Sequence, residues 1–323
     1  MSAAIPNSFR DLILKILIPI SRDRMTLNNM TQKKKINSWL LASRPKTLLA
    51  AVVPVLVGSA LAVSVKKFFL PYSIVALFCS ILIQMGTNFT NDLYDFLKGA
   101  DNQKRKGPRR VLASGLISVT EMKIAIVFIF GLAFVFGLYL VSSAGLLILW
   151  VGIISIVAGI IYTAGPFPLA YNGLGDLFVF LFFGVVGTMG TFYLHTQEIS
   201  VLSLVVSIPV GALITNILIV NNYRDIEEDR EANKRTLAVL LGRTFTRWQY
   251  IVLISVCYLI SLILNFQFNY NLWIFLPYLT LPITITLVRM LYKYNGEELN
   301  KTLELTARFA GLYGLLFSIG LVI

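Results

Sequence analysis

Residues 88–101 read Asn88-Phe-Thr-Asn-Asp-Leu-Tyr-Asp-Phe-Leu-Lys-Gly-Ala-Asp101, and they close a long apolar run of the chain. On a helix, the first polar residues of this stretch fall at positions i, i+3, i+4 and i+7, so they share one face. They are Asn88, Asn91, Asp92 and Asp95. Carboxylates and amides at the end of a membrane helix are costly to place against lipid, so they normally face a bundle interior or a watery cavity. The stretch therefore predicts a functional site inside a bundle of membrane helices.

The composition of the whole chain also indicates a membrane protein. Of its 323 residues, 57% are hydrophobic and 14% are charged, and the mean hydropathy is +0.76. A soluble domain is about 45–50% apolar and about 25% charged. The apolar runs are continuous and lack the alternation of a membrane β-barrel. We expect an all-α, polytopic helical bundle of about nine transmembrane helices around a central cavity, since one span needs about 20 apolar residues. The expected spans are residues 47–65, 71–96, 122–141, 145–163, 175–194, 201–221, 249–265, 271–291 and 305–323.

The basic residues are distributed unevenly over the loops. The net charge of +12 is compatible with nucleic-acid binding. However, most loop cations fall in loops that nine spans place on the same side as the N-terminus, and the opposite loops hold little beyond Lys66 and Lys67. This is the positive-inside asymmetry of membrane proteins. It predicts a cell (inner) membrane protein whose N-terminus and active site are cytoplasmic, and it argues against a nucleic-acid partner.

A second polar stretch, Asn221-Asn-Tyr-Arg-Asp-Ile-Glu-Glu-Asp229, ends a later apolar run on the same predicted side. Asn222, Asp225 and Asp229 again read i, i+3 and i+7. Mg²⁺ prefers oxygen ligands, and it usually takes one or two carboxylates from the protein and completes its shell with water and substrate phosphate. Two facing acidic stretches therefore predict one or two Mg²⁺ ions bridged by a diphosphate.

The membrane setting points to the kind of diphosphate. A diphosphate leaves readily from an allylic carbon, where the cation is stabilised by resonance, and a long hydrocarbon tail explains why the site lies among apolar helices. Arginine and lysine pair with phosphate oxygens, so the basic loop at 104–110 is a candidate for phosphate binding, although the topology alone also explains its charge. Arg44 and Lys46, just before the first span, are either interfacial anchors or contacts to an anionic substrate.

Several motifs together resemble the UbiA-type intramembrane prenyltransferases, over the chain from about Ser38 to the C-terminus. The two main motifs are Asn91-Asp-x-x-Asp95 and Asp225-x-x-x-Asp229. Finer features resemble the branch of this family that prenylates 1,4-dihydroxy-2-naphthoate in menaquinone or phylloquinone synthesis. They are Arg44-Pro-Lys-Thr-Leu, Tyr162-Thr-x-Gly-Pro, Gly173-Leu-Gly-Asp176, Lys234-Arg-Thr-Leu-Ala, and Asp101 where the general family pattern has its third acidic residue at the position of Gly99.

The resemblance implies a Mg²⁺-dependent reaction. A polyprenyl group would pass from an allylic polyprenyl diphosphate to 1,4-dihydroxy-2-naphthoate with decarboxylation, giving demethylmenaquinone and diphosphate. The resemblance also implies that Asp92, Asp95 and Asp101 bind one Mg²⁺ and that Asp225 and Asp229 bind the other. The other residues to which it assigns roles are Asn88, Asn91 and Asn222 around the metals, Lys98, Arg109, Arg224 and Lys234 on the phosphates, Tyr162 beside the allylic cation, and Arg44 or Lys46 on the acceptor carboxylate.

Two alternatives remain open at this point. The same chemistry could use another acceptor, such as 4-hydroxybenzoate or homogentisate. A cation-coupled transporter also carries buried acidic residues, but it places them near the bilayer midplane rather than at helix ends. We expect residues 1–37 to be an N-terminal extension, interfacial or not translated, and residues 38–323 to be the enzymatic domain. The lipid bilayer is its expected environment, and no obligate protein partner is expected.

Overall fold

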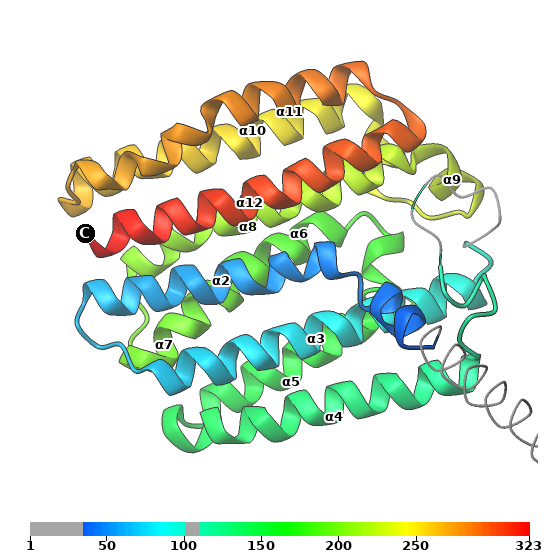
Figure 1. Cartoon of the computed structure of the whole chain (residues 1–323), viewed down its shortest axis with the longest axis horizontal. Coiled ribbons are helices and arrows are strands. Elements are labelled where there is room, and N and C mark those ends of the chain that lie inside the picture. Colours follow the sequence, from blue (N-terminus) through cyan, green and yellow to red (C-terminus); the bar gives the residue numbers. More distant parts are fainter. Residues whose placement is uncertain (1–34, 101–106, 108–109) are drawn as a thin grey trace, which may run out of the picture.

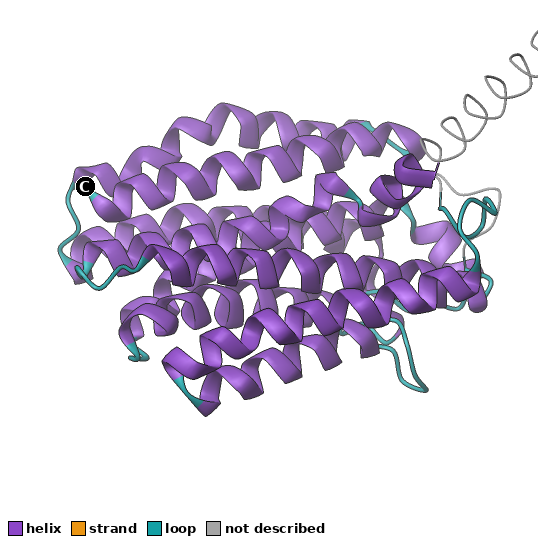
Figure 2. Ribbon diagram, turned by 60° about the horizontal axis from the view of Figure 1, so that its bottom comes forward, coloured by secondary structure: helices purple, strands orange, loops and turns teal. Residues whose placement is uncertain are grey.

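The chain forms a bundle of helices in the part that the structure describes. The structure is a computed structural model that describes residues 35–100, 107 and 110–323. Within these residues it contains helices and one isolated β-bridge, between Asn172 and Arg235. Figures 1 and 2 show the long helices running roughly side by side. Most of the expected N-terminal extension lies outside the described residues, as do Asp101 and Arg109.

The helices follow the expected spans closely. The longer ones are α2 (Pro45–Ser64), α3 (Leu70–Leu97), α4 (Val119–Ala144), α5 (Leu146–Ile161), α8 (Val201–Arg224), α10 (Leu237–Phe268), α11 (Leu281–Lys293) and α12 (Leu299–Val322). The shorter ones are η1 (Leu169–Tyr171), α6 (Gly175–Val179), η2 (Phe180–Met189), α7 (Gly190–Thr196), α9 (Ile226–Glu231), η3 (Leu272–Thr280) and η4 (Gly296–Glu298).

Eight segments of the described chain are long and apolar enough to cross a membrane. Some of them join several elements, as α6, η2 and α7 do in the span Gly175–Thr196. Helix α5 is also apolar, but it has only 16 residues, fewer than the about 20 that span a bilayer. The expected polytopic all-α membrane fold is therefore confirmed, with eight full-length spans and one shorter apolar helix.

Local sequence signals explain where some of the helices begin and end. Ser118 caps α4, because its side chain accepts a hydrogen bond from the Glu121 backbone N–H while the Glu121 carboxylate accepts one from the Ser118 backbone N–H at 3.0 Å. This reciprocal capping box satisfies amide groups that have no partner within the helix. Gly145 has a φ of 82°, a backbone conformation that glycine adopts readily, and it forms the turn between α4 and α5.

Helix α8 is the most buried span of the described chain. Within its apolar 18-residue window, 78% is buried inside the protein. It packs against η2, α10 and α12. A Cβ placed on Gly184 of η2 would lie 2.6 Å from the Cα of Gly211 of α8, so only glycine fits at this contact. Small residues let membrane helices approach closely, and here they bring the π-helical segment η2 against the centre of the bundle.

The two acidic stretches lie at the same end of the bundle. Helix α3 carries the first stretch at its C-terminal end, and α8 carries the second, which continues into α9. Figure 1 shows both helix ends on the right, beside α9, and the C-terminus of the chain on the opposite side. The fold thus brings together two polar segments that are more than 100 residues apart in the sequence.

Candidate active site

A central cavity of about 370 Å³ opens between α2, α3, α4, α5, η2 and α8. Its volume lies within the about 300–1,000 Å³ that is common for small-molecule sites. Most of its wall is apolar, and the polar lining gathers at the end that carries the acidic stretches. The polar residues lining that end include Arg44, Asn88, Asn91, Asp95, Arg110, Asp176, Asn222 and Lys234. The expected central cavity is therefore present in the structure.

The first acidic stretch supplies two buried carboxylates. Asp92 is 2% exposed and Asp95 is 4% exposed. Arg110 lies between them, with its Nε 3.7 Å from Asp92 Oδ1 and its Nη2 3.6 Å from Asp95 Oδ2. The basic loop indicated that a cation was present here, but we assigned the role to the neighbouring Arg109, which lies outside the described residues. Arg110 is therefore a site residue that sequence reasoning missed.

The two asparagines of this stretch connect α3 to its neighbours. Asn88 donates to the carbonyl oxygen of Ser43 at 2.9 Å, which ties α3 to the segment before α2. Asn91 accepts a hydrogen bond from the Thr163 hydroxyl, just after α5. Both asparagines line the cavity. These contacts hold the end of α3 in place and so position the adjacent carboxylates.

Tyr171 connects the two acidic stretches. Its hydroxyl donates to Asp95 Oδ1 at 2.8 Å. The ammonium groups of Lys98 and Lys234 lie 4.4 and 5.6 Å from its ring centroid, within the range of a cation–π contact. Its carbonyl oxygen accepts from the backbone N–H of Arg235 at 3.0 Å. We did not assign Tyr171 to the site from the sequence, since its position among these groups depends on the fold.

Lys98 lies at the end of α3, where it donates to the carbonyl oxygen of Thr163 at 2.7 Å. Desolvation lowers the pKa of Lys98, and the negative charge of Asp95 opposes this shift. The ammonium group of Lys98 therefore lies close to the carboxylate of Asp95 at the acidic end of the bundle.

The helix that carries the second acidic stretch is interrupted at its first carboxylate, Asp225. Helix α8 ends at Arg224 and α9 begins at Ile226, so Asp225 lies between two helices. The backbone N–H of Asp229 still donates to the carbonyl oxygen of Asp225 at 2.8 Å. One helical turn is thus retained, and both carboxylates remain at the same end of the bundle. Asp225 is 5% exposed and Asp229 is 7% exposed.

Arg224 is surrounded by protein groups. It is 1% exposed, and its Nε and Nη2 donate to the two carboxylate oxygens of Asp225 at 2.6 and 2.7 Å. Its remaining bonds reach Asn300 Oδ1 at 2.7 Å and Asn221 Oδ1 at 2.8 Å. Arg224 is also absent from the cavity lining. This geometry favours a residue that positions Asp225 over the phosphate ligand that the resemblance implied.

Asp229 is buried, and one of its carboxylate oxygens has no hydrogen-bond partner among the described residues. Its Oδ1 lies 3.3 Å from Lys234 Nζ, while its Oδ2 is buried and has no hydrogen-bond partner among the described residues. Burial raises the pKa of Asp229 to about 6, Lys234 opposes the shift, and the charges of Asp225 and Asp95 add to it. Lys234 also lies 5.6 Å from the ring centroid of Tyr171, whose hydroxyl donates to Asp95, so a chain of contacts joins the two acidic stretches.

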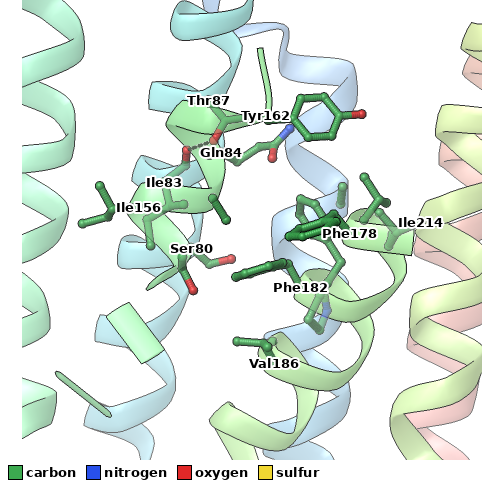
Figure 3. Close-up of a pocket in the computed structure, with 18 of the residues that line it drawn as sticks. Ser80, Ile83, Gln84, Thr87, Ile156, Tyr162, Phe178, Phe182, Val186 and Ile214 are labelled. Carbon is green, nitrogen blue, oxygen red and sulfur yellow. Dashed lines mark hydrogen bonds between the residues drawn. The ribbon is translucent and has the colours of Figure 1, made fainter. Parts of the chain in front are cut away.

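Tyr162 lies among these carboxylates at the boundary of the polar end. Desolvation raises the pKa of its phenol, and the negative charges of Asp176, Asp95 and Asp229 raise it further. Tyr162 lines the cavity. Figure 3 shows it above the apolar part of the cavity, close to Gln84. The phenol therefore stays protonated and presents a neutral ring between the acidic groups and the apolar wall.

Asp176 adds a further carboxylate to the cavity lining. It is 6% exposed, and its two oxygens accept from Asn222 Nδ2 at 3.3 Å and from Gln249 Nε2 at 2.8 Å. We did not include Asp176 among the site residues, because an acidic residue at the start of a span is also explained by the helix dipole. The motif Gly173-Leu-Gly-Asp176 was the signal that could have identified it.

The described residues hold no group of three or more His, Cys, Asp or Glu side chains that could bind a metal ion together. The carboxylates occur instead as two pairs, and Asp101 lies outside the described residues. This arrangement fits Mg²⁺, which commonly uses only one or two protein carboxylates. The unpartnered, buried Oδ2 of Asp229 fits as well, because a bound cation would satisfy it.

The structure places the expected site residues in two groups. Those that line the cavity are Arg44, Asn88, Asn91, Asp95, Tyr162, Asn222 and Lys234. The others are not part of the lining but contact a lining residue: Asp92 contacts Arg110, Lys98 contacts Thr163, Arg224 and Asp225 contact Asn221, and Asp229 contacts Lys234. The side chain of Lys46 is outside the described part of the structure.

Comparison with known proteins places this architecture in a family. The UbiA prenyltransferase family profile matches residues 51–312. The 1,4-dihydroxy-2-naphthoate octaprenyltransferase of Haemophilus influenzae is 36% identical over 315 residues, which cover 91% of this chain and 100% of that protein. The protein of the same name from Escherichia coli is 35% identical over 299 residues, covering 90% of this chain and 96% of that protein. A solved structure of a UbiA homolog from Archaeoglobus fulgidus bound to GPP and Mg²⁺ aligns with a TM-score of 0.63 at 17% identity, covering 88% of this chain and 99% of that one.

The bundle, its cavity and the two facing acidic stretches define a multi-pass intramembrane enzyme. The profile match and the two relatives extend over most of the chain. The chain therefore belongs to the UbiA prenyltransferase family. The resemblance inferred from the motifs is confirmed.

Proposed function

We propose that this chain transfers a polyprenyl group from an allylic polyprenyl diphosphate to 1,4-dihydroxy-2-naphthoate. The acceptor loses its carboxylate as CO₂, and the products are demethylmenaquinone and diphosphate. The observation that carries the proposal is the convergence of the two acidic stretches at one end of an otherwise apolar cavity. The choice of acceptor is supported by the relatives of 35 and 36% identity, which carry the name of that activity.

The acidic end of the cavity would hold the diphosphate through metal ions. Asp92 and Asp95, with Asp101, would bind one Mg²⁺, and Asp225 and Asp229 would bind the other. When bound, Mg²⁺ would neutralise the charge that develops on the departing diphosphate. Asn88, Asn91 and Asn222 would orient the carboxylates or complete the metal shells.

Cationic side chains around the acidic end would contact the phosphate oxygens directly. Lys98 and Lys234 both lie over the Tyr171 ring, and Arg110 adjoins the first carboxylate pair. Arg109 is a further candidate from the same loop. In the low-dielectric surroundings of the cavity, fixed positive groups stabilise developing negative charge more strongly than they do in water. Arg224 acts indirectly, by holding Asp225.

The apolar remainder of the cavity would hold the hydrocarbon tail. Tyr162 lies where the polar end meets the apolar wall, so its ring would face the allylic carbon as the diphosphate leaves. The negative face of an aromatic ring attracts positive charge, and the surrounding apolar helices exclude water, which would otherwise capture the cation. Arg44 or Lys46 would hold the acceptor carboxylate.

The loop charges support an orientation of the chain in the membrane. The end of the bundle that carries the acidic stretches is joined to the basic loops, and basic loops normally remain cytoplasmic. We therefore place the chain in the cell (inner) membrane, with its N-terminus and active site on the cytoplasmic side. A soluble diphosphate product would leave on that side, while the prenylated product stays in the bilayer.

The test uses membranes that express the full chain, supplied with 1,4-dihydroxy-2-naphthoate, a mixture of polyprenyl diphosphates and Mg²⁺. Mass spectrometry should detect a demethylmenaquinone that is absent when EDTA is added, and its mass gives the length of the prenyl chain. A product that appears only with 4-hydroxybenzoate or homogentisate would overturn the acceptor. No product with any acceptor, together with substrate-dependent uptake into vesicles, would favour a cation-coupled transporter.

A further inference from the structure

Gln84 places a polar group in the cavity wall. It lies on α3, four residues before Asn88, and it lines the cavity. A carboxamide offers two donors and an acceptor. In the described part of the structure, Gln84 makes one long hydrogen bond, from its Nε2 to Asn88 Oδ1 at 3.4 Å. Figure 3 shows its side chain extending into the cavity beside Tyr162. Most of its hydrogen-bonding capacity therefore remains for a ligand.

The neighbouring polar groups on the same wall are already satisfied. The Ser80 hydroxyl donates to the carbonyl oxygen of Ala51 at 3.0 Å, and the Thr87 hydroxyl donates to the carbonyl oxygen of Ile83 at 2.9 Å. Both hydroxyl protons are thereby used within the protein, so neither hydroxyl can donate to a ligand, and only its acceptor capacity remains. Gln84 is therefore the side chain of this wall best able to recognise a polar atom.

Two aromatic rings project into the same space from the other side. Phe178 and Phe182 are stacked, with ring centroids 6.0 Å apart and an interplanar angle of 13°. Figure 3 shows both rings extending into the cavity towards the wall formed by α3. Stacked, nearly parallel rings offer a flat surface of the kind that packs well against another aromatic ring. The compartment between Gln84 and these two rings therefore combines a flat apolar side with a polar edge.

The compartment also lies next to the reacting end of the cavity. Gln84 is about one helical turn, roughly 5.4 Å, from Asn88, which belongs to the acidic end. A molecule in the compartment would have Tyr162 beside it. An acceptor placed here would therefore be close to the allylic carbon of a diphosphate held by the acidic end.

We propose that this compartment binds the aromatic ring of the acceptor, a planar hydroxylated acid with two fused rings, and that Gln84 hydrogen-bonds one ring hydroxyl. This inference rests on the proposed function. A polar group left without a partner in an apolar site costs free energy, and a hydrocarbon tail could not satisfy Gln84. A ring hydroxyl satisfies the carboxamide, while the flat rings of Phe178 and Phe182 support the ring face. Gln84 is thereby a specificity-determining residue for the acceptor.

The first test compares Gln84→Leu with the parent protein by steady-state kinetics, varying each substrate in turn. The change removes the hydrogen bond and keeps a side chain of similar size. We expect the KM for 1,4-dihydroxy-2-naphthoate to rise about tenfold, because one hydrogen bond contributes about 1.4 kcal/mol. The KM for the polyprenyl diphosphate should stay within a factor of two. Ser80→Ala, on the same helix, is the matched control and should change neither constant, since its hydroxyl is engaged by Ala51.

A second test identifies the contacted hydroxyl through binding rather than turnover. The fluorescence of 1-hydroxy-2-naphthoate and 4-hydroxy-2-naphthoate, each lacking one ring hydroxyl, reports their binding to the purified full chain. Gln84→Leu should weaken one analogue about tenfold and leave the other unchanged, because only one of them retains the contacted hydroxyl. Phe178→Leu should weaken both analogues, since it removes the stacking surface, and it provides the test if Gln84→Leu does not fold.

The outcomes separate this inference from the proposed function. A higher KM for the polyprenyl diphosphate in Gln84→Leu, with the acceptor KM unchanged, would assign the compartment to the tail and overturn the inference. Equal binding of both analogues by parent and variants would also overturn it. In either case the parent would still form demethylmenaquinone. A parent that forms no naphthoate product would instead overturn the proposed function.

Discussion

The hydroxyl of Tyr171 donates to Asp95 Oδ1 at 2.8 Å, across 76 residues of sequence. The ammonium groups of Lys98 and Lys234 lie over the ring of the same tyrosine. Its carbonyl oxygen accepts a hydrogen bond from the backbone N–H of Arg235, which follows the second acidic stretch. A single side chain therefore contacts groups from both halves of the site. Its removal should disturb the relative placement of those halves more than the chemistry of any one group.

We expect Tyr171→Phe to raise the Mg²⁺ concentration that gives half-maximal activity about tenfold. The variant keeps the ring that contacts both lysines but loses the hydrogen bond to Asp95, and a bond to a charged group is typically worth about 1.5–3 kcal/mol. Magnesium titration of prenyl transfer measures the effect. Tyr94→Phe, on α3 next to Asp95, is the control and should resemble the parent. An unchanged magnesium requirement in Tyr171→Phe would show that the hydroxyl does not position Asp95.

Asp92→Ala and Asp225→Ala should each abolish turnover while the protein still inserts into the membrane. Each change removes one carboxylate of a pair, and a pair is already a minimal set of protein ligands for Mg²⁺. Product formation is measured by mass spectrometry, and insertion by the yield of monodisperse protein. Glu231→Ala changes an exposed acidic residue of α9 and should be neutral. Near-normal activity in either aspartate variant would contradict the metal assignment.

Arg224→Met should lower the stability of the protein by about 3–5 kcal/mol, because it leaves the carboxylate of Asp225 buried without its main partner. Thermal unfolding in detergent measures the loss. Arg230→Met, which changes an exposed arginine of α9, is the control and should have little effect. If Arg224→Met unfolds like the parent and instead binds diphosphate less tightly, Arg224 would be a phosphate ligand, as the resemblance implied.

The apparent affinity for Mg²⁺ should fall as the pH drops below about 6. The pKa of Asp229 is raised to about 6, so a proton competes with the metal for this carboxylate in that range and not at pH 8. A single proton limits the loss to about tenfold per pH unit. Magnesium-dependent thermal stabilisation at several pH values measures it without turnover. Asp229→Asn should bind Mg²⁺ weakly at every pH and lose this pH dependence.

In the metal-free protein, the raised pKa of Asp229 makes the stability of the fold depend on pH. The folded pKa of Asp229 lies above the ordinary value of about 3.9 for an aspartate, so the folded state holds its proton over a window in which the unfolded state has lost it. Stability therefore decreases as the pH rises from about 4 to about 6. Above that window, a bound Mg²⁺ should restore the loss. A metal-free protein whose stability is constant over this window would contradict the raised pKa.

Much of this site was predictable because charged residues in an apolar membrane chain are costly to expose to lipid and so gather in the interior of the bundle. The two acidic stretches could be recognised from Asp92, Asp95, Asp225 and Asp229 alone, since each stretch ends an apolar run. The bundle and most of its spans followed from hydropathy. These features depend on local sequence, and local sequence is sufficient to predict them.

The remaining site residues depend on contacts between distant segments. Arg110 and Tyr171 come from loops that only the folded bundle brings to Asp95. The bond between Arg224 and Asn300 joins residues 76 positions apart, so the burial of this arginine had no signal in its own neighbourhood. The break at Asp225 also escaped prediction, because the spacing of the acidic residues fits an uninterrupted helix equally well.

Helix α5 has only 16 residues, so at about 1.5 Å per residue its length is about 24 Å. A bilayer hydrocarbon core is about 30 Å thick. Its exposed side chains, which include Trp150, Ile154 and Val157, face away from the protein, so the lipid beside them must become thinner or the helix must draw polar headgroups inward. We therefore expect the wall of the cavity that α5 forms to respond to the length of the surrounding acyl chains. The enzyme would then work at different rates in short-chain and long-chain lipids of the same charge.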